Sequence, residues 1–237
     1  MRFLVFQHIA CEHPGIFRRF FAEDGIEWDA VELDEGEAIP ELDGYDALWV
    51  MGGPMDVWDV EELPWLIDEK KAIRRWVREL GKPYMGLCLG HQLLADALGG
   101  TCGPQVPSEI GIMDVELTEA AKSDPVFGAL PAVQKCLQWH SVRVAQAPDD
   151  AVIMATSNLC SNQAMRVGER AWSMQYHMEL DSTTIPEWGK VPAYEEALAR
   201  THGAGALQKM ADDAQANMAD FEANSRTLYR GFMSAIG

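Results

Sequence analysis

Basic residues are scarce in this sequence, and their scarcity excludes several classes of partner. Against 37 aspartates and glutamates there are only 19 lysines and arginines, which gives a formal net charge of −18 over 237 residues. Because binding to nucleic acid needs a basic surface against the phosphates, no nucleic-acid partner is expected. The same charge disfavours an anionic membrane surface, and no uninterrupted apolar run is long enough to span a bilayer. We interpret the acidity as a contribution to solubility.

Cysteine is also scarce, and its spacing excludes the common zinc and redox motifs. No C-x-x-C pair occurs among the five cysteines, which are Cys11, Cys88, Cys102, Cys136 and Cys160. An odd and irregularly spaced set favours a reducing, cytoplasmic setting. The apolar run at residues 2–7 is too short for a signal peptide and favours a buried strand. His8, Cys11 and His13 have no further cluster of ligands near them, so we expect neither a metal ion nor a cofactor.

Alternating strand and helix patterns predict an α/β fold with a mostly parallel sheet covered on both faces. In the first half, the expected strands are residues 2–7, 28–33, 46–51 and 83–87, and the expected helices are residues 14–22 and 64–80. The second half is richer in strands, which are expected at residues 111–117, 135–139, 151–156, 163–167 and 171–176.

The last part of the chain carries a helical pattern. From residue 192 onward, apolar residues recur at three, four or seven positions and predict one long amphipathic helix, with a broken helix as the alternative. We therefore expect a main domain over residues 1–190 and a helical extension over residues 191–237 packed on that domain. Contact with another copy of the chain, as in a homodimer, is the other use of such a helix.

A nucleophile elbow is the most informative motif. The apolar run over residues 83–87 ends within the sequence Gly86-Leu87-Cys88-Leu89-Gly90, and a helical pattern begins at once. In such an elbow, glycines flank a turn so tight that side chains would clash with the neighbouring strand and helix. The turn lifts the thiol of Cys88 clear of the sheet and places it at a helix N-terminus, where the helix dipole favours a thiolate.

A cysteine nucleophile needs a base, and the base needs a group that orients it. His177 and Glu179 lie two residues apart at the end of an expected strand, so both side chains can face one pocket. The carboxylate would then hold the imidazole, and the imidazole would take the thiol proton. A structural histidine is the alternative, but it would not explain the glutamate two residues on in a chain with a thiol elbow.

Three further positions complete a possible acyl-transfer site. The backbone N–H of Leu89, directly after Cys88, is one natural oxyanion donor. Gly53, in a Gly-Gly-Pro turn at the end of an expected strand, can present a second N–H. Gln92 follows Cys88 by four residues, about one helical turn, so it can face the same pocket.

Together these motifs resemble the class I (triad) glutamine amidotransferases. The nucleophile motif, the Gln175-Tyr176-His177-Met178-Glu179 stretch and the Met51-Gly52-Gly53-Pro54 turn agree with that family in order and spacing. The resemblance covers residues 1–188 and is greatest to stand-alone proteins similar to the amidotransferase domain of GMP synthase. It implies a flavodoxin-like three-layer α/β core and a catalytic domain over residues 1–190.

The resemblance also implies a reaction and a set of contacts. Cys88 would attack the γ-carbonyl of glutamine or a γ-glutamyl compound, with His177 and Glu179 completing the triad. The amides of Gly53 and Leu89 would hold the oxyanion, and Gln92 would contact the glutamyl group. Trp139 and His140 occupy the place where the family contacts the α-amino and α-carboxylate groups. The chain departs from the family at Val142, where an aspartate is common.

The receiver of the released ammonia stays open at this point. No Gly-x-x-x-x-Gly-Lys loop is present, and fewer than 50 residues follow the core, which leaves no room for a synthetase domain. Ammonia would pass to a separate synthetase partner, or the chain would be a free-standing hydrolase such as a γ-glutamyl peptidase. A third alternative is a non-catalytic regulatory or scaffolding subunit, which the intact cysteine, histidine and glutamate disfavour.

Overall fold

The computed structural model describes residues 1–237, and its nine strands form one continuous sheet in the order β2-β1-β3-β4-β9-β8-β7-β5-β6. The first five strands in this order pair in parallel: β2 (Glu27–Glu32), β1 (Arg2–Gln7), β3 (Ala47–Val50), β4 (Tyr84–Leu87) and β9 (Ala171–Met174). With β9 as the fifth strand, this is the 2-1-3-4-5 order of flavodoxin-like sheets. The expected α/β fold class is confirmed.

The other half of the sheet is antiparallel. It consists of β8 (Ala164–Val167), β7 (Ala151–Thr156), β5 (Thr101–Leu117) and β6 (Val133–Gln146). The strands expected at 111–117 and 135–139 are therefore much too short. Glycines and prolines interrupt the hydrophobic pattern at the start of β5, but pairing with β6 continues across a register shift between Pro104 and Glu109.

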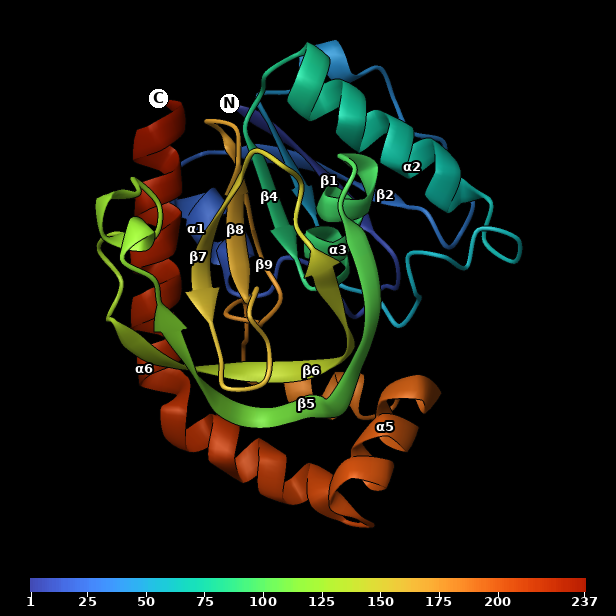
Figure 1. Ribbon diagram of the computed structural model, residues 1–237, viewed down its shortest axis with the longest axis vertical. Helices are drawn as coiled ribbons and strands as arrows, with labels where there is room; N and C mark the ends of the chain where they lie inside the picture. The colour runs from blue at the N-terminus through green and yellow to red at the C-terminus, as the bar shows by residue number, and fades with distance from the viewer.

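Helices cover both faces of the parallel half (Figure 1). Helices α1 (Phe17–Glu23) and α6 (Ala206–Ile236) pack on one face, and α2 (Trp65–Arg74) and α3 (Leu89–Ala97) pack on the other. Neighbouring side chains of β1 point to opposite faces of the sheet, because side chains alternate along a strand. Phe3 packs against Phe232 of α6, whereas Leu4 belongs to the core beneath α2 and α3. This is the expected three-layer arrangement.

Two helices have other boundaries than the sequence predicts, and in each the local backbone conformation differs from a regular α-helix. The helix expected from residue 14 begins at Phe17, because Gly15 adopts φ +49° and lies so close to Glu179 that a Cβ would come 1.7 Å from its carbonyl oxygen. The helix expected over residues 64–80 ends in a π-helical turn, η2 (Arg75–Glu79). The short 3-10 turns η1 (Leu42–Gly44) and η3 (Ala120–Ser123) complete the connections.

The C-terminal helical pattern forms two helices rather than one. The chain turns at Gly203 and Gly205, both with positive φ, between α5 (Pro192–His202) and α6. A further short helix, α4 (Thr184–Trp188), lacks a clear pattern in the sequence. These helices enclose a third apolar core beneath β5 and β6 that includes Trp139, Trp188, Tyr194 and Phe221.

The far end of α6 returns to the main sheet. Phe232 packs edge-on against the rings of Phe3, Trp49 and Trp172, and the C-terminus lies near the N-terminus (Figure 1). This packing supports the proposal that residues 191–237 belong to the same domain as residues 1–190. None of the helices combines the length and the apolar character that crossing a bilayer requires.

Candidate active site

Cys88 occupies a sharp turn between β4 and α3. It is the one non-glycine residue with positive φ, at +50°, and only 6% of its surface is exposed. A Cβ on Gly86 would lie 2.7 Å from the carbonyl oxygen of Gly90, and a Cβ on Gly90 would lie 2.1 Å from that of Val50. Both approaches are too close for any side chain, so the two glycines permit α3 to cross the strands directly above the sheet. The expected elbow geometry is confirmed.

His177 and Glu179 form a buried pair beside this elbow. Nδ1 of His177 lies 2.6 Å from Oε1 of Glu179, and the backbone N–H of Met178 donates to Oε2 at 2.9 Å. Both carboxylate oxygens therefore have a partner, and the histidine keeps its Nε2 for another group. The thiol of Cys88 is near enough to act on the charge of the His177 ring. The structure thus brings together the three residues that the sequence selected.

Three distant segments fix the loop that carries this pair. The backbone of His177 exchanges two hydrogen bonds with Leu137 of β6, at 2.9 and 3.3 Å. The N–H of Ile16, at the start of α1, donates to the carbonyl oxygen of Glu179 at 2.8 Å. From α6, the hydroxyl of Ser225 donates to the carbonyl oxygen of Met178. The loop is therefore anchored from the sheet and from both ends of the chain.

The environment of His177 favours its charged form. Burial alone would lower its pKa, but the Glu179 carboxylate and the Cys88 thiol outweigh burial and raise the pKa of His177 well above its ordinary value. The indole of Trp188 meets the imidazole edge-on at 4.5 Å and limits its movement. By contrast, burial lowers the pKa of His91 to about 3. His91 is therefore a poor base, although it lies only three residues after Cys88.

Two backbone amides near Cys88 are free to donate. Neither Gly53 nor Leu89 donates its N–H to any group of the protein. The two residues are neighbours, because a Cβ on Gly53 would lie 3.0 Å from a methyl carbon of Leu89. His8 holds the turn before Gly53 in place: its Nδ1 bonds to the carbonyl oxygen of Gly52 at 2.8 Å and its Nε2 to Glu69 at 2.9 Å. His8 thus has protein partners on both ring nitrogens.

A cavity of about 200 Å³ opens above Cys88. Its walls include five of the residues expected at the site, namely Gly53, Cys88, Gln92, Trp139 and His140. Nε2 of Gln92 donates to the carbonyl oxygen of Val142 at 3.3 Å, and Nδ1 of His140 bonds to the same oxygen at 2.8 Å. Val142, the residue that departs from the family pattern, thus orients two of the wall residues through its backbone carbonyl oxygen.

Comparison with known proteins identifies the family of this chain. A sequence model described as glutamine amidotransferase class-I matches residues 16–188. The chain belongs to the class-I glutamine amidotransferase family. Its resemblance to that family is thereby confirmed, along with its flavodoxin-like fold.

Several relatives span most of the chain. The glutamine amidotransferase-like protein YfeJ of Salmonella typhimurium is 28% identical over 86% of both chains. Gamma-glutamyl peptidase 3 of Arabidopsis thaliana is 24% identical over 73% of this chain and 71% of the relative. A glutamine-hydrolysing GMP synthase subunit of Sulfolobus acidocaldarius is 29% identical over 65% of this chain and 78% of the relative. Among solved structures, a glutamine amidotransferase from Thermotoga maritima superposes with a TM-score of 0.86 at 25% identity, covering 98% of each chain.

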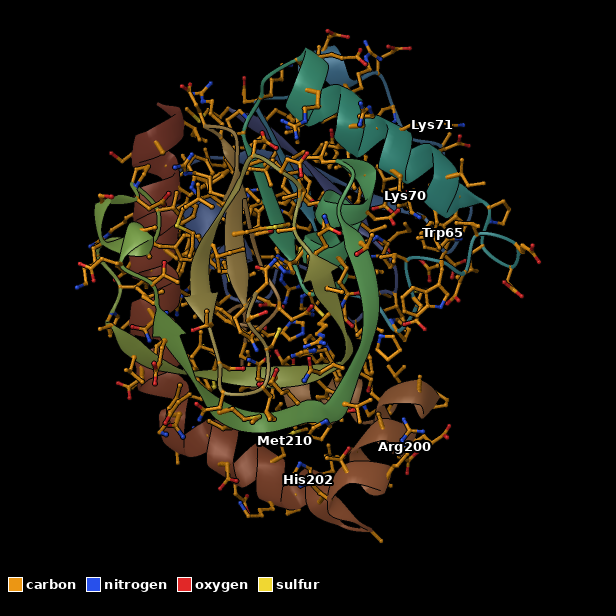
Figure 2. All side chains as sticks on the ribbon, in the orientation of Figure 1. Trp65, Lys70, Lys71, Arg200, His202 and Met210 are labelled. Atoms are coloured by element: carbon orange, nitrogen blue, oxygen red, sulfur yellow. The ribbon has the colours of Figure 1, made fainter.

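Some residues around Cys88 were not singled out by any sequence motif. Nε2 of Gln175 lies 3.5 Å from the sulfur of Cys88, and Oε1 of Gln175 accepts from Gln92 at 3.1 Å. Gln175 lies two residues before His177, so the same strand alternation would have found it. Asp56 and Arg200 also line the cavity. Arg200 comes from α5 (Figure 2). No local signal in the sequence connects it to Cys88.

We predict that Gly90→Ala destabilises the fold because its methyl group would meet the carbonyl oxygen of Val50 at 2.1 Å. The expected loss in the free energy of unfolding is about 2–3 kcal/mol, typical of overpacking in a core. Gly103→Ala is the matched control, since nothing lies within 4 Å of its Cβ position, and it should change stability by less than about 0.5 kcal/mol. Urea unfolding measures both, and equal losses would contradict the crowded crossing at the elbow.

Proposed function

We propose that this chain hydrolyses the γ-amide of glutamine or of a γ-glutamyl compound through a thioester on Cys88. The proposal rests chiefly on one observation, the buried pair of His177 and Glu179 next to the thiol of Cys88, which itself lines a cavity. A nucleophile, a base and an orienting carboxylate in this order are the elements of triad catalysis. The class-I glutamine amidotransferase family supports amide hydrolysis in general.

The reaction proceeds in two steps. The Cys88 sulfur attacks the γ-carbonyl carbon, and the amides of Gly53 and Leu89 donate to the oxyanion that forms. The imidazolium of His177 gives its proton to the leaving nitrogen, the C–N bond breaks, and an amine or ammonia departs. His177, now neutral, takes a proton from water, which attacks the thioester carbon. The C–S bond then breaks, glutamate leaves, and the Cys88 sulfur and the His177 imidazolium are restored.

The cavity walls suit the rest of a glutamyl group. Gln92, Trp139 and His140 offer polar and aromatic surface on the side of the cavity formed by α3 and β6. Asp56, in the loop after β3, supplies a half-buried carboxylate for the α-ammonium group. The substrate is thus a small zwitterionic molecule with its γ-carbonyl above Cys88.

Two forms of this function differ in what happens to the leaving group. Transfer of ammonia requires a separate synthetase, as the name of the GMP synthase subunit from Sulfolobus acidocaldarius suggests for that protein. A γ-glutamyl peptidase instead releases an amino acid or peptide. Arg200 favours the peptidase, because its side chain on α5 lines the cavity while remaining 64% exposed, and its one ion pair, with Glu196, spans 3.4 Å. This guanidinium is available to the carboxylate of a leaving amino acid.

We expect Cys88→Ala to abolish release of ammonia or amine from glutamine and from a panel of γ-glutamyl peptides. The loss should reach at least about 10³-fold, because removing the nucleophile of a triad removes the covalent route. Cys102→Ala is the matched control and should retain activity. The assay follows free glutamate and ammonia together. Wild-type protein without turnover, and without labelling of Cys88 by a glutamine-analogue electrophile, would instead support a non-catalytic role.

The contact with Arg200 is tested by a matched substrate pair. γ-Glutamylglycine and γ-glutamylglycinamide differ only in the terminal carboxylate, so we expect wild-type protein to hydrolyse the first with the lower KM. Arg200→Met should remove most of that preference, about tenfold, which corresponds to one charge-assisted hydrogen bond. Arg230→Met, an exposed arginine on α6, is the control and should keep the preference. Equal KM values for the two substrates in the wild type would count against the peptidase.

A further inference from the structure

Glu12 is a buried acid that the proposed reaction does not use. It lies in the loop between β1 and α1, and only 1% of its surface is exposed. The hydroxyl of Tyr194, from α5, donates to Oε1 of Glu12. The other oxygen, Oε2, has no hydrogen-bond partner. Burying a carboxylate oxygen without a hydrogen-bond partner costs free energy, which suggests that Glu12 has a role beyond packing.

The unsatisfied oxygen lies beside the imidazole of His177. A Cβ built on Gly52 would come 1.8 Å from Oε2 of Glu12 and 3.3 Å from Cε1 of His177, so the carboxylate and the ring converge on one point above that glycine. Cε1 is the carbon between the two ring nitrogens, and its C–H carries much of the positive charge of an imidazolium. A carboxylate oxygen on this side of the ring attracts the imidazolium more strongly than the neutral imidazole.

The groups around Glu12 determine the pKa of its carboxyl group. Burial raises the pKa of Glu12 to about 7, with His177 and His8 acting to lower it and Glu179 to raise it. His8 itself is occupied by Glu69 and by the carbonyl oxygen of Gly52. Tyr194 contributes a neutral donor, which favours the carboxylate form. Glu12 therefore gains or loses its charge near neutral pH, next to the proposed base.

We propose that Glu12, held by Tyr194, is a second carboxylate that positions His177 and stabilises its imidazolium. Glu179 holds the ring through Nδ1, and Glu12 supports it from the Cε1 edge, which leaves Nε2 for the thiol of Cys88. The role rests on the proposed function, because it requires Cys88 and His177 to act as a pair.

This role makes the C-terminal helices part of the site. Both Glu12 and Tyr194 lie outside residues 16–188, the segment that the family model matches. The pair joins the first loop of the chain to α5, and Tyr194 also packs against Trp139 and Trp188. The face of α5 that carries Tyr194 thus reaches both the cavity wall and the support of the base.

A purely structural acid would act differently. It would stay protonated as a fixed link between the loop and α5, and replacing it would lower stability without changing how the reactivity of Cys88 depends on pH. A positioning carboxylate would instead impose its own titration on the Cys88–His177 pair. The dependence of thiol reactivity on pH therefore separates the two roles.

The test is the rate of alkylation of Cys88 by iodoacetamide between about pH 5 and 9, resolved by peptide mass spectrometry. In the wild type we expect the rate to rise in a step near pH 7 as Glu12 ionises. Glu12→Gln should abolish this step. Tyr194→Phe should move it to higher pH by about one unit, because the carboxylate loses a hydrogen bond. Tyr229→Phe, which removes a tyrosine hydrogen bond to Asp24 far from the site, is the matched control and should leave the step in place.

Cys102, whose pKa burial raises to about 12, is the internal reference in the same digests. An unchanged step in Glu12→Gln would overturn the role of Glu12 and leave the proposed function intact. Should Glu12→Gln fail to fold, the absence of a shift in Tyr194→Phe would overturn it equally. Cys88 reacting no faster than Cys102 in the wild type at every pH would instead reject Cys88 as nucleophile, and the role of Glu12 with it.

Discussion

The close crossing of α3 over the sheet is the constraint on which the site depends. Gly90 lies so near the carbonyl of Val50, and Gly86 so near Gly90, that the turn between them has almost no freedom. Cys88 is therefore held at a positive φ that cysteine does not favour. The same turn leaves the amide of Leu89 free beside that of Gly53. One steric constraint thus places the thiol and the amide of Leu89, while His8 holds the turn that carries Gly53.

The base is placed by a different principle, convergence from distant parts of the chain. Hydrogen bonds from Leu137, Ile16 and Ser225 hold the backbone of the loop that carries His177. Trp188 closes over the imidazole. The antiparallel half of the sheet, α1 and the C-terminal helices are therefore all required for one histidine. Within α6, a helix of 31 residues, Ser225 is the residue that bonds to this loop.

Local motifs were predictable from the sequence, and long-range contacts were not. The elbow at Cys88 and the strand alternation that pairs His177 with Glu179 are properties of a few neighbouring residues, and the structure has both. The length of β5 was missed because its cross-strand pairing with β6 overrides the glycines and prolines in its own sequence. Glu12 and Tyr194 are 182 positions apart, and only the folded chain brings them together.

The central claim is that Cys88 forms a γ-glutamyl thioester, and acid quenching during turnover tests it most directly. Wild-type protein mixed with a γ-glutamyl substrate would be quenched, digested and analysed by mass spectrometry. The account predicts the mass of one γ-glutamyl group on the peptide that contains Cys88, and its removal by hydroxylamine, since a thioester is labile to this nucleophile. Turnover with the adduct on another residue, or with no adduct at the shortest times, would contradict it.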